Sequence, residues 1–260
     1  MTVTIGVDIG QAKDPTAICV VEVARQPSAK ALETVGELGV ELTDKDGTAR
    51  SWDEILDRAD DRLAQTSMDA EGRRRVLQRA MTTDSHHWVR HLERLPLGTS
   101  YPAVVDRIAA VWAGAMTRRG KGGMMLYLDA TGVGRPVVDL LTQRRIPVRA
   151  VHFVAGTTYT KTRERGGWRY SLGKGRLVSR LQVLLQTGRL HLPADSPEAV
   201  ALRREFADYE RLVSDTGHAT YGAMTASRHD DLVTAVGLAV LEEPFGLARP
   251  VVGSVTVASP

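Results

Sequence analysis

The segment that most constrains the fold is 123–132, "GMMLYLDATG", in which apolar residues follow one another almost without interruption. Such a run, bounded by glycines, is typical of a strand in the middle of a sheet that is covered on both faces. Helical patterns flank it at 100–119 and 134–145, where apolar residues recur every three or four positions. We therefore predict an α/β fold, with a mixed central β-sheet flanked by helices on both faces.

Two carboxylates stand at the ends of predicted strands. Residues 3–10, "VTIGVDIG", and 16–23, "TAICVVEV", form a predicted β-hairpin around a turn that contains Asp-Pro. Alternation in the first strand places its apolar residues on one face and Asp8 on the other. Asp129 ends the central strand in the same way. Because ligands of open α/β sheets collect at the carboxyl ends of strands, we predict that both acids border one site.

A third acidic contribution opens the last predicted helix, in 229–243, "HDDLVTAVGLAVLEE". Helical spacing places Asp231 on the apolar, core-facing side, and Asp230 lies about 100° further round the helix. Carboxylates that converge without a counter-charge disfavour joint ionisation, and a divalent cation removes this cost. Oxygen ligands suit Mg²⁺ or Mn²⁺, and two such ions would support phosphodiester hydrolysis.

A zinc site is the alternative that His86, His87 and His91 suggest. Adjacent histidines on a strand point to opposite faces, and no cysteine accompanies them. We therefore predict no zinc.

Charge is unevenly distributed along the chain. Residues 161–180 contain seven basic side chains and one acid, a local charge of +6, whereas 51–71 carry seven acids and two arginines, a local charge of −5. The basic stretch is either a solvated hairpin or a surface that neutralises nucleic-acid phosphates. We favour DNA binding, by Lys161, Arg163, Arg165, Arg169, Lys174 and Arg176.

Four motifs occur together in one order: Asp8 on the first strand of the hairpin, "LDATGVGRPVVDLL", "GKGRLVSRLQVLLQTGRLHLP" and "HDDLVTAVGLA". As a set they resemble the nuclease domain of phage terminase large subunits, over roughly residues 1–24 and 84–243. That family has a ribonuclease H-like fold and cuts double-stranded DNA during viral genome packaging.

The resemblance implies a metal-dependent DNA endonuclease that uses two Mg²⁺ or Mn²⁺ ions. It implies that Asp8, Asp129 and Asp231 are catalytic, metal-binding acids, with Asp230 as a further ligand and His229 near the metals. The implied partners are double-stranded DNA and a separate packaging ATPase, a portal or a small terminase subunit.

Two features depart from that family. Full-length terminases carry an ATPase, but no G-x-x-x-x-G-K-[ST] motif occurs in this sequence. Residues 25–83 are also longer than the family's usual connection. We therefore predict a single nuclease domain over 1–246 with a helical insertion around 25–83, followed by a disordered tail at 247–260. Within the insertion, capping and charge patterns predict helices at 51–65 and 69–81, whereas 28–50 is expected to be irregular or short-stranded.

Two other functions stay open. "GVDIG" and "DATGVG" are similar to the phosphate-binding turns of sugar kinases and actin-like ATPases. A nuclease-like subunit without activity, which binds DNA or serves assembly, is the second alternative.

No secretory signal pattern and no run of 18 apolar residues occurs in the sequence. We therefore expect no membrane association and a location in the cytoplasm, which would be that of the host cell if the protein is viral.

Overall fold

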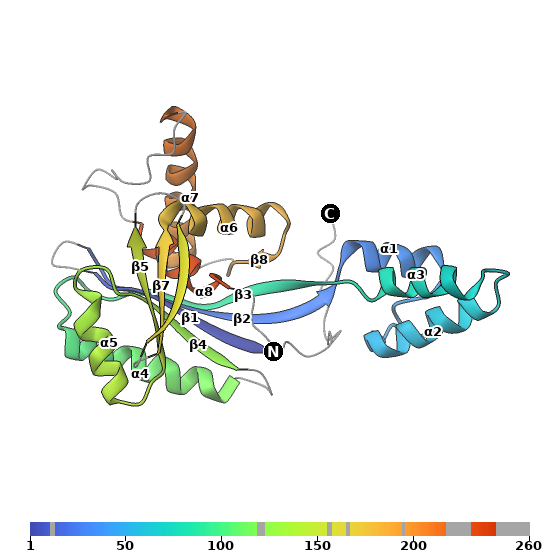
Figure 1. Ribbon diagram of the computed structural model, residues 1–260, viewed down its shortest axis with the longest axis horizontal. Helices are drawn as coiled ribbons and strands as arrows, with labels where there is room; N and C mark the ends of the chain where they lie inside the picture. Colours follow the sequence, from blue (N-terminus) through green and yellow to red (C-terminus); the bar gives the residue numbers. More distant parts are fainter. Residues whose placement is uncertain are drawn as a thin grey trace. The chain divides into compact units, whose positions relative to one another are not determined.

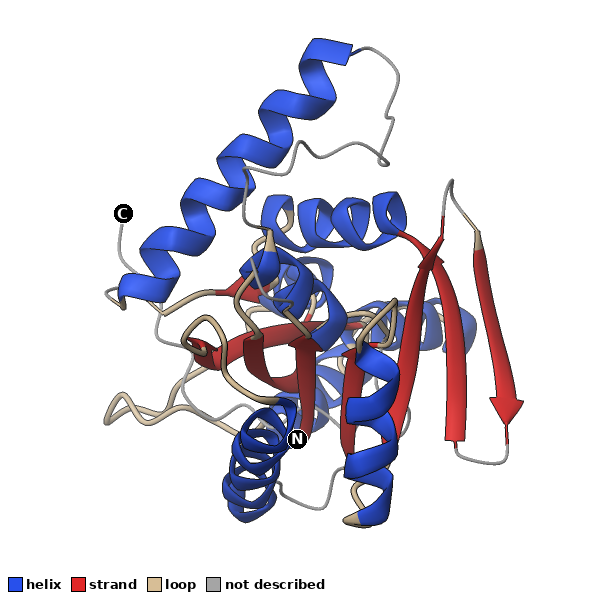
Figure 2. Ribbon diagram, turned by 90° about the vertical axis from the view of Figure 1, so that its left-hand side faces the viewer, coloured by secondary structure: helices blue, strands red, loops and turns tan. Residues whose placement is uncertain are grey.

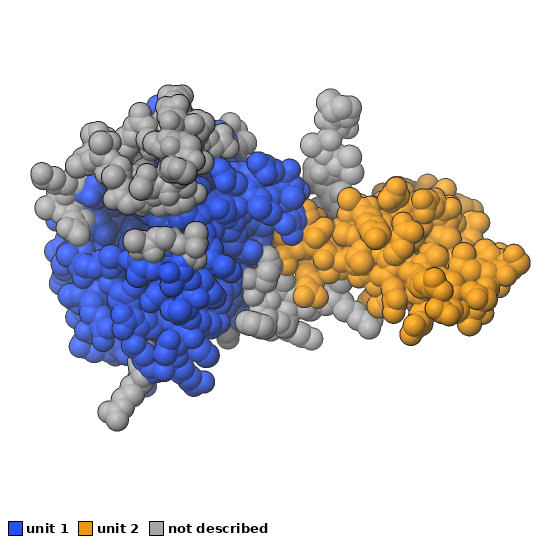
Figure 3. All heavy atoms as spheres, turned by 45° about the horizontal axis from the view of Figure 1, so that its top comes forward, with its two compact units in different colours: residues 1–23, 87–245 blue, residues 24–86, 246–260 orange. Residues whose placement is uncertain are grey.

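The chain is described by a computed structural model, in which residues 1–10, 14–118, 123–154, 158–164, 167–193, 196–216 and 230–242 are placed, with the backbone alone for 208–216. It divides into two compact units, coloured separately in Figure 3. The first consists of Met1–Val23 and His87–Phe245, and the second is built on Ala24–His86.

The central sheet of the described chain has eight strands in the order β6-β7-β5-β4-β1-β2-β3-β8. β1 pairs antiparallel with β2 and parallel with β4, and the parallel pairing continues from β4 to β5 and from β5 to β7. β6 is antiparallel to β7, and β8 is parallel to β3. The strands are β1 (Thr2–Asp8), β2 (Ala17–Pro27), β3 (Thr83–Arg94), β4 (Met124–Asp129), β5 (Val148–Val154), β6 (Tyr159–Glu164), β7 (Gly167–Gly173) and β8 (Leu190–His191).

Helices cover both faces of this sheet (Figures 1 and 2). On one face, α4 (Tyr101–Arg118) and α5 (Gly134–Gln143) pack on the apolar side of β1 and β4. On the other face lie α6 (Lys174–Gln186) and α8 (Asp231–Ala239), and α7 (Pro197–Thr216) packs on α8. The predicted α/β fold with a mixed central sheet is confirmed, and its layout is consistent with a ribonuclease H-like fold.

Two glycines let the helices of the second face approach closely. A Cβ on Gly6 of β1 would lie 2.0 Å from the carbonyl oxygen of Ala235, so only glycine lets α8 lie directly on β1. A Cβ on Gly237 would meet the side chain of Leu177 of α6 at 2.0 Å. The stack of β1, α8 and α6 therefore brings the beginnings of α6 and α8 toward the polar face of β1.

The second unit contains three helices, α1 (Ala29–Glu37), α2 (Trp52–Ala64) and α3 (Ala70–Ala80). Their N-caps are Ser28, Ser51 and Asp69, whose side chains accept hydrogen bonds from backbone N–H groups. The sequence predicts α2 and α3, but it predicts irregular structure where α1 forms. α1 has only nine residues, and its buried residues pack in a small core that includes Trp52 and Ile55.

Among the described helices, none combines the length and the apolar character that crossing a membrane requires. The tail at 247–260, predicted to be disordered, lies outside the described residues.

Candidate active site

Asp8 and Asp129 lie side by side at the carboxyl ends of two neighbouring strands, β1 and β4. Val7 of β1 lies beside Leu128 of β4 in parallel register, so the next residue of each strand is a carboxylate on the face that α8 covers. The Asp129 Oδ1 atom accepts a hydrogen bond of 2.8 Å from the backbone N–H of Thr131. This bond fixes the turn that leads into α5 and orients the Asp129 carboxylate.

The third carboxylate of the site is Asp230, the residue that directly precedes α8. The Nζ atom of Lys174, the first residue of α6, donates to Oδ2 of Asp230. Both side chains are partly buried, with 26% of Lys174 and 20% of Asp230 exposed. The close packing of α6 on α8 thus delivers one cation to the acids.

The carboxylates of this site change one another's pKa. The pKa of Asp8 is raised well above its ordinary value, first by burial and then by the negative charges of Asp129, Asp230 and, to a smaller extent, Asp231, and Lys174 opposes the shift. Burial also raises the pKa of Asp129, while its hydrogen bonds with Thr131 and the charge of Lys174 lower it. Within the described residues, the charge of Lys174 therefore does not balance three carboxylates that lie close enough to perturb each other.

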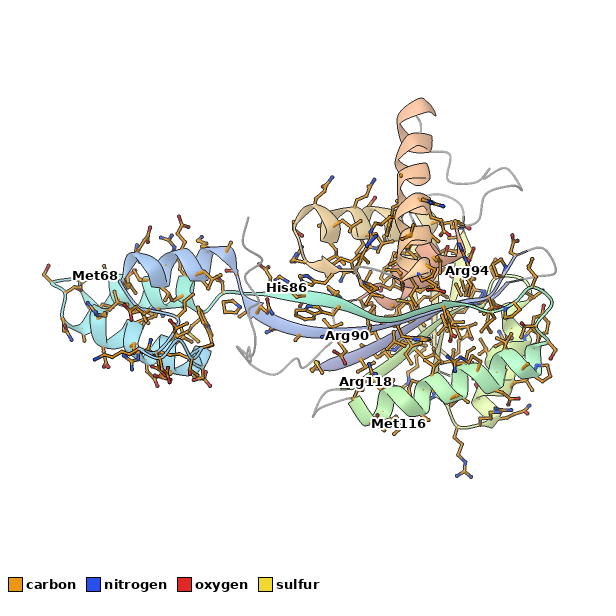
Figure 4. All side chains as sticks on the ribbon, turned by 180° about the vertical axis from the view of Figure 1, so that it is seen from behind. Met68, His86, Arg90, Arg94, Met116 and Arg118 are labelled. Atoms are coloured by element: carbon orange, nitrogen blue, oxygen red, sulfur yellow. The ribbon has the colours of Figure 1, made fainter. Side chains whose placement is uncertain are left out.

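Asp231 has a different set of contacts. Its buried carboxylate accepts two hydrogen bonds from Arg94, which lies at the end of β3 (Figure 4), at 2.5 Å from Nε and 3.2 Å from Nη2. Arg94 also pairs with Glu205 of α7, and Glu205 in turn accepts from the backbone N–H of Val233 at 3.2 Å. These contacts fasten the first turn of α8 to β3 and α7. Asp230 and Asp231 are thus each paired with one cation, Lys174 and Arg94 respectively, and the charges of both acids raise the pKa of Asp8.

The donor set fits a divalent cation of the Mg²⁺ or Mn²⁺ type. Asp8, Asp129 and Asp230 offer only carboxylate oxygens, which such ions prefer. Within the described part of the chain, no three His, Cys, Asp or Glu side chains are grouped closely enough to hold a metal ion. The acids nevertheless perturb the pKa of Asp8, because electrostatic effects between carboxylates reach further than ligand bonds.

The predicted DNA-binding residues fall into two groups. Lys161 and Lys174 are partly buried and form ion pairs, with Glu242 and Asp230 respectively. Arg163, Arg169 and Arg176 are exposed on β6, β7 and α6.

The exposed arginines are also engaged within the chain. The guanidinium of Arg176 lies 4.4 Å from the ring centre of Tyr159, and that of Arg169 lies 3.2 Å from Glu164. Arg163 lies over the ring of Trp168 at 5.7 Å. The predicted residues Arg165 and His229 lie outside the described residues.

A second polar cluster lies beyond the other end of α8, around the carboxylate of Glu242. This carboxylate accepts hydrogen bonds from three tyrosine hydroxyls, from a guanidinium and from an ammonium group. The donors are Tyr159 at 2.7 Å, Tyr127 at 2.9 Å, Tyr170 at 3.0 Å, Lys161 at 3.0 and 3.1 Å, and Arg149 at 3.1 Å. Burial would raise the pKa of Glu242, but the hydrogen bonds outweigh it and hold the pKa below its ordinary value.

Sequence reasoning missed this Glu242 cluster, and it missed the position of Lys174 beside Asp230. Tyr127 carried a signal for the cluster, because its hydroxyl group sits in an otherwise apolar strand two positions before Asp129 and therefore on the same face. Nothing in the linear sequence associates Tyr127 with Glu242, which lies 115 residues further along the chain.

Comparisons of this chain with family models, with curated proteins and with solved structures gave no match. The assignment of a function therefore rests on the sequence motifs and on the geometry of the two clusters.

Proposed function

We propose that this protein is a metal-dependent endonuclease that hydrolyses phosphodiester bonds of double-stranded DNA. The observation that carries the proposal is that three carboxylates from separate parts of the chain, Asp8, Asp129 and Asp230, lie close together at the carboxyl ends of β1 and β4. The charges of Asp129 and Asp230 raise the pKa of Asp8. Such an arrangement is costly for a fold unless a cation and a substrate use it.

Each residue has its own part in this proposal. Asp8, Asp129 and Asp230 would hold the divalent ions, and Asp231 would keep Asp230 in place through its bonds with Arg94. When bound, Mg²⁺ or Mn²⁺ supplies Lewis acidity that activates a water molecule and stabilises the leaving 3′-oxygen. Lys174 holds positive charge next to Asp230 and would attract the scissile phosphate to the same edge.

The exposed arginines of β6, β7 and α6 support DNA as the substrate. Arg163, Arg169 and Arg176 carry positive charge in the same compact unit as the acids. Contacts between arginine and phosphate supply much of the affinity of proteins for duplex DNA. The order of the motifs further favours a terminase-type nuclease, which would act in viral genome packaging in the host cytoplasm together with a packaging ATPase, a portal or a small terminase subunit.

A nicking assay on supercoiled plasmid tests the proposal. The purified chain should convert the plasmid to open-circular and linear forms with Mn²⁺ or Mg²⁺ and not with EDTA. Asp129→Asn should lower the rate by at least about a hundredfold, because the amide keeps the volume of the side chain but loses the charge that holds the ion.

Asp139→Asn is the matched control, since Asp139 is an exposed acid of α5 that pairs with Arg135 on the other face of the sheet. It should leave nicking unchanged. Equal nicking by well-folded wild-type protein and Asp129→Asn would remove the acidic site from the mechanism. Hydrolysis of ATP without any nicking would instead favour the kinase-like or actin-like alternative.

A further inference from the structure

The donors around Glu242 carry more positive charge than one carboxylate neutralises. Arg149 and Lys161 contribute two positive charges against the single negative charge of Glu242. The guanidinium of Arg176 adds a third nearby, stacked on the ring of Tyr159. A structural ion pair requires one cation per carboxylate, whereas among the described residues two guanidinium groups and an ammonium group gather around the carboxylate of Glu242. Such a set of donors suits a strong anion.

The geometry of the donors suits an oxyanion with two charged oxygens. Tyr159 donates to one oxygen of Glu242, Tyr127 and Tyr170 donate to the other, and Lys161 contacts both. A nucleic-acid phosphodiester likewise presents two unesterified oxygens that share one negative charge. Tyrosine, lysine and arginine are all common donors to DNA phosphates.

The charged groups of the Glu242 cluster are partly exposed, whereas two of its tyrosines are buried. Side-chain exposure is 23% for Arg149, 25% for Lys161 and 14% for Glu242, so solvent reaches the charged groups but neither Tyr127 nor Tyr170. Glu242 lies three residues beyond Ala239, the last residue of α8, so it can withdraw without breaking the hydrogen bonds of that helix. β6, which carries Tyr159 and Lys161, is an edge strand of the sheet.

We propose that Arg149, Lys161, Tyr127, Tyr159 and Tyr170 form a binding site for a backbone phosphate of nucleic acid, which Glu242 occupies in the free protein and leaves when the nucleic acid binds. This inference rests on the proposed function and deepens it, because the site lies at the opposite end of α8 from the acidic site. The nine residues of α8 span about 14 Å, or about four nucleotides along one strand of duplex DNA. The bound phosphate would thus fix how the duplex passes the acids.

Equilibrium binding of a fluorescent DNA duplex in EDTA tests this inference without any cleavage. Two variants empty the site: Glu242→Gln removes the negative charge, and Glu242→Asp keeps the charge but shortens the side chain. If Glu242 fills the site about nine-tenths of the time, either variant should lower the Kd for the duplex about tenfold. The slope of log affinity against log salt should stay nearly the same, because the wild-type complex neutralises the same phosphate once Glu242 has left the site.

Glu164→Gln is the matched control. Glu164 lies on the same hairpin, is 44% exposed and pairs with Arg169, so its replacement changes the net charge by the same amount without touching the cluster. It should lower the Kd by no more than about twofold, as an exposed charge does.

Three results would overturn the inference. The first is that both Glu242 variants bind the duplex no more tightly than Glu164→Gln. The second is that neither variant folds, as judged by circular dichroism, because a carboxylate that the fold requires cannot be displaced by a ligand. The third is that Glu242→Asp binds inorganic phosphate in calorimetry while its affinity for the duplex stays at the control value, which would make the site one for small anions. Failure of the proposed nuclease is seen separately, as a lack of nicking with Mn²⁺ by protein that still binds DNA.

Discussion

The two ends of α8 use opposite electrostatic arrangements. Before its first turn, Asp8, Asp129 and Asp230 share the single charge of Lys174, and the pKa of Asp8 is raised. Beyond its last turn, the carboxylate of Glu242 is shared by five donors, and its pKa is lowered. Among the described residues, carboxylates outnumber cations at the first end and cations outnumber the carboxylate at the second, although one short apolar helix connects them. The proposed nuclease would use the acidic end for a cation and the basic end for a phosphate.

The variant with the largest expected effect, Gly6→Ala, would displace α8 and with it both ends of the helix. Gly6→Ala would place a methyl group 2.0 Å from the Ala235 oxygen and 2.5 Å from the Ala239 nitrogen, so α8 would have to move away from β1. We expect a loss of about 3 kcal/mol or more in the free energy of unfolding, measured by urea titration. Gly114→Ala is the control, because a Cβ there meets nothing within 4 Å in the middle of α4, and it should gain up to about 1 kcal/mol. Equal stability of the two variants would show that α8 does not lie on β1 in this way.

The second prediction separates the two neighbouring acids of α8. Asp231→Asn should lower the free energy of unfolding by about 1–3 kcal/mol, because it weakens a buried ion pair with Arg94 that retains Glu205 as a second partner. Asp230→Asn should change stability by less than about 1 kcal/mol but should remove most of the nicking activity. Thermal melts and nicking rates of the two variants check this division. The reverse pattern would return the ligand role to Asp231.

The third prediction concerns pH and has opposite signs at the two ends. The native pKa of Asp8 lies above its ordinary value of 3.8, so the native state keeps this proton longer and loses stability as pH rises through the native pKa. Asp8→Asn should therefore stabilise the metal-free protein by on the order of 1 kcal/mol at neutral pH, and by less near pH 4. Melting curves in EDTA across this pH range measure the effect. If Asp8→Asn stabilised the protein equally at every pH, ionisation of Asp8 would not be the cause of the stability difference.

At the other end, the native pKa of Glu242 lies below its ordinary value of 4.5. Its stabilising contribution is present above pH 4.5 and is lost as pH falls through the native pKa. Glu242→Gln should therefore be less stable than the wild type at neutral pH, with a difference that narrows in acid. A difference that widens in acid would contradict the assignment of Glu242 as the ionised partner of Arg149 and Lys161.

The smallest expected effect concerns the exposed arginines. Arg163→Ala combined with Arg176→Ala should flatten the slope of log affinity for duplex DNA against log salt by about 1.8, at about 0.9 for each lost phosphate contact. Arg144→Ala is the control, since Arg144 follows α5 on the other face of the sheet and pairs with Asp106. If all slopes are equal, DNA contacts a different surface, and the basic hairpin is only solvated.

Much of the fold could be predicted from periodicity. The continuous apolar run of β4 predicts a central strand, and the helical spacing of α4 predicts its covering layer, because local patterns report which faces are buried. The helix α1 was not predicted, since its nine residues are stabilised mainly by packing on α3 and by the N-cap at Ser28.

The sequence by itself determined the candidate acids and the strand ends that carry them. Asp8 and Asp129 end apolar strands, and the two-residue period of β1 separates Asp8 from the apolar face of that strand. That Asp129 lies on the same face as Asp8 follows from the parallel pairing of β1 with β4. Only the tertiary structure distinguishes the contacts of Asp230 and Asp231, which are adjacent in sequence: Lys174 of α6 pairs with Asp230, and Arg94 of β3 pairs with Asp231. The Glu242 cluster was likewise decided by packing, since its donors come from β4, β5, β6 and β7, and a hydrogen bond between residues that are distant in sequence leaves no periodic signal in the chain.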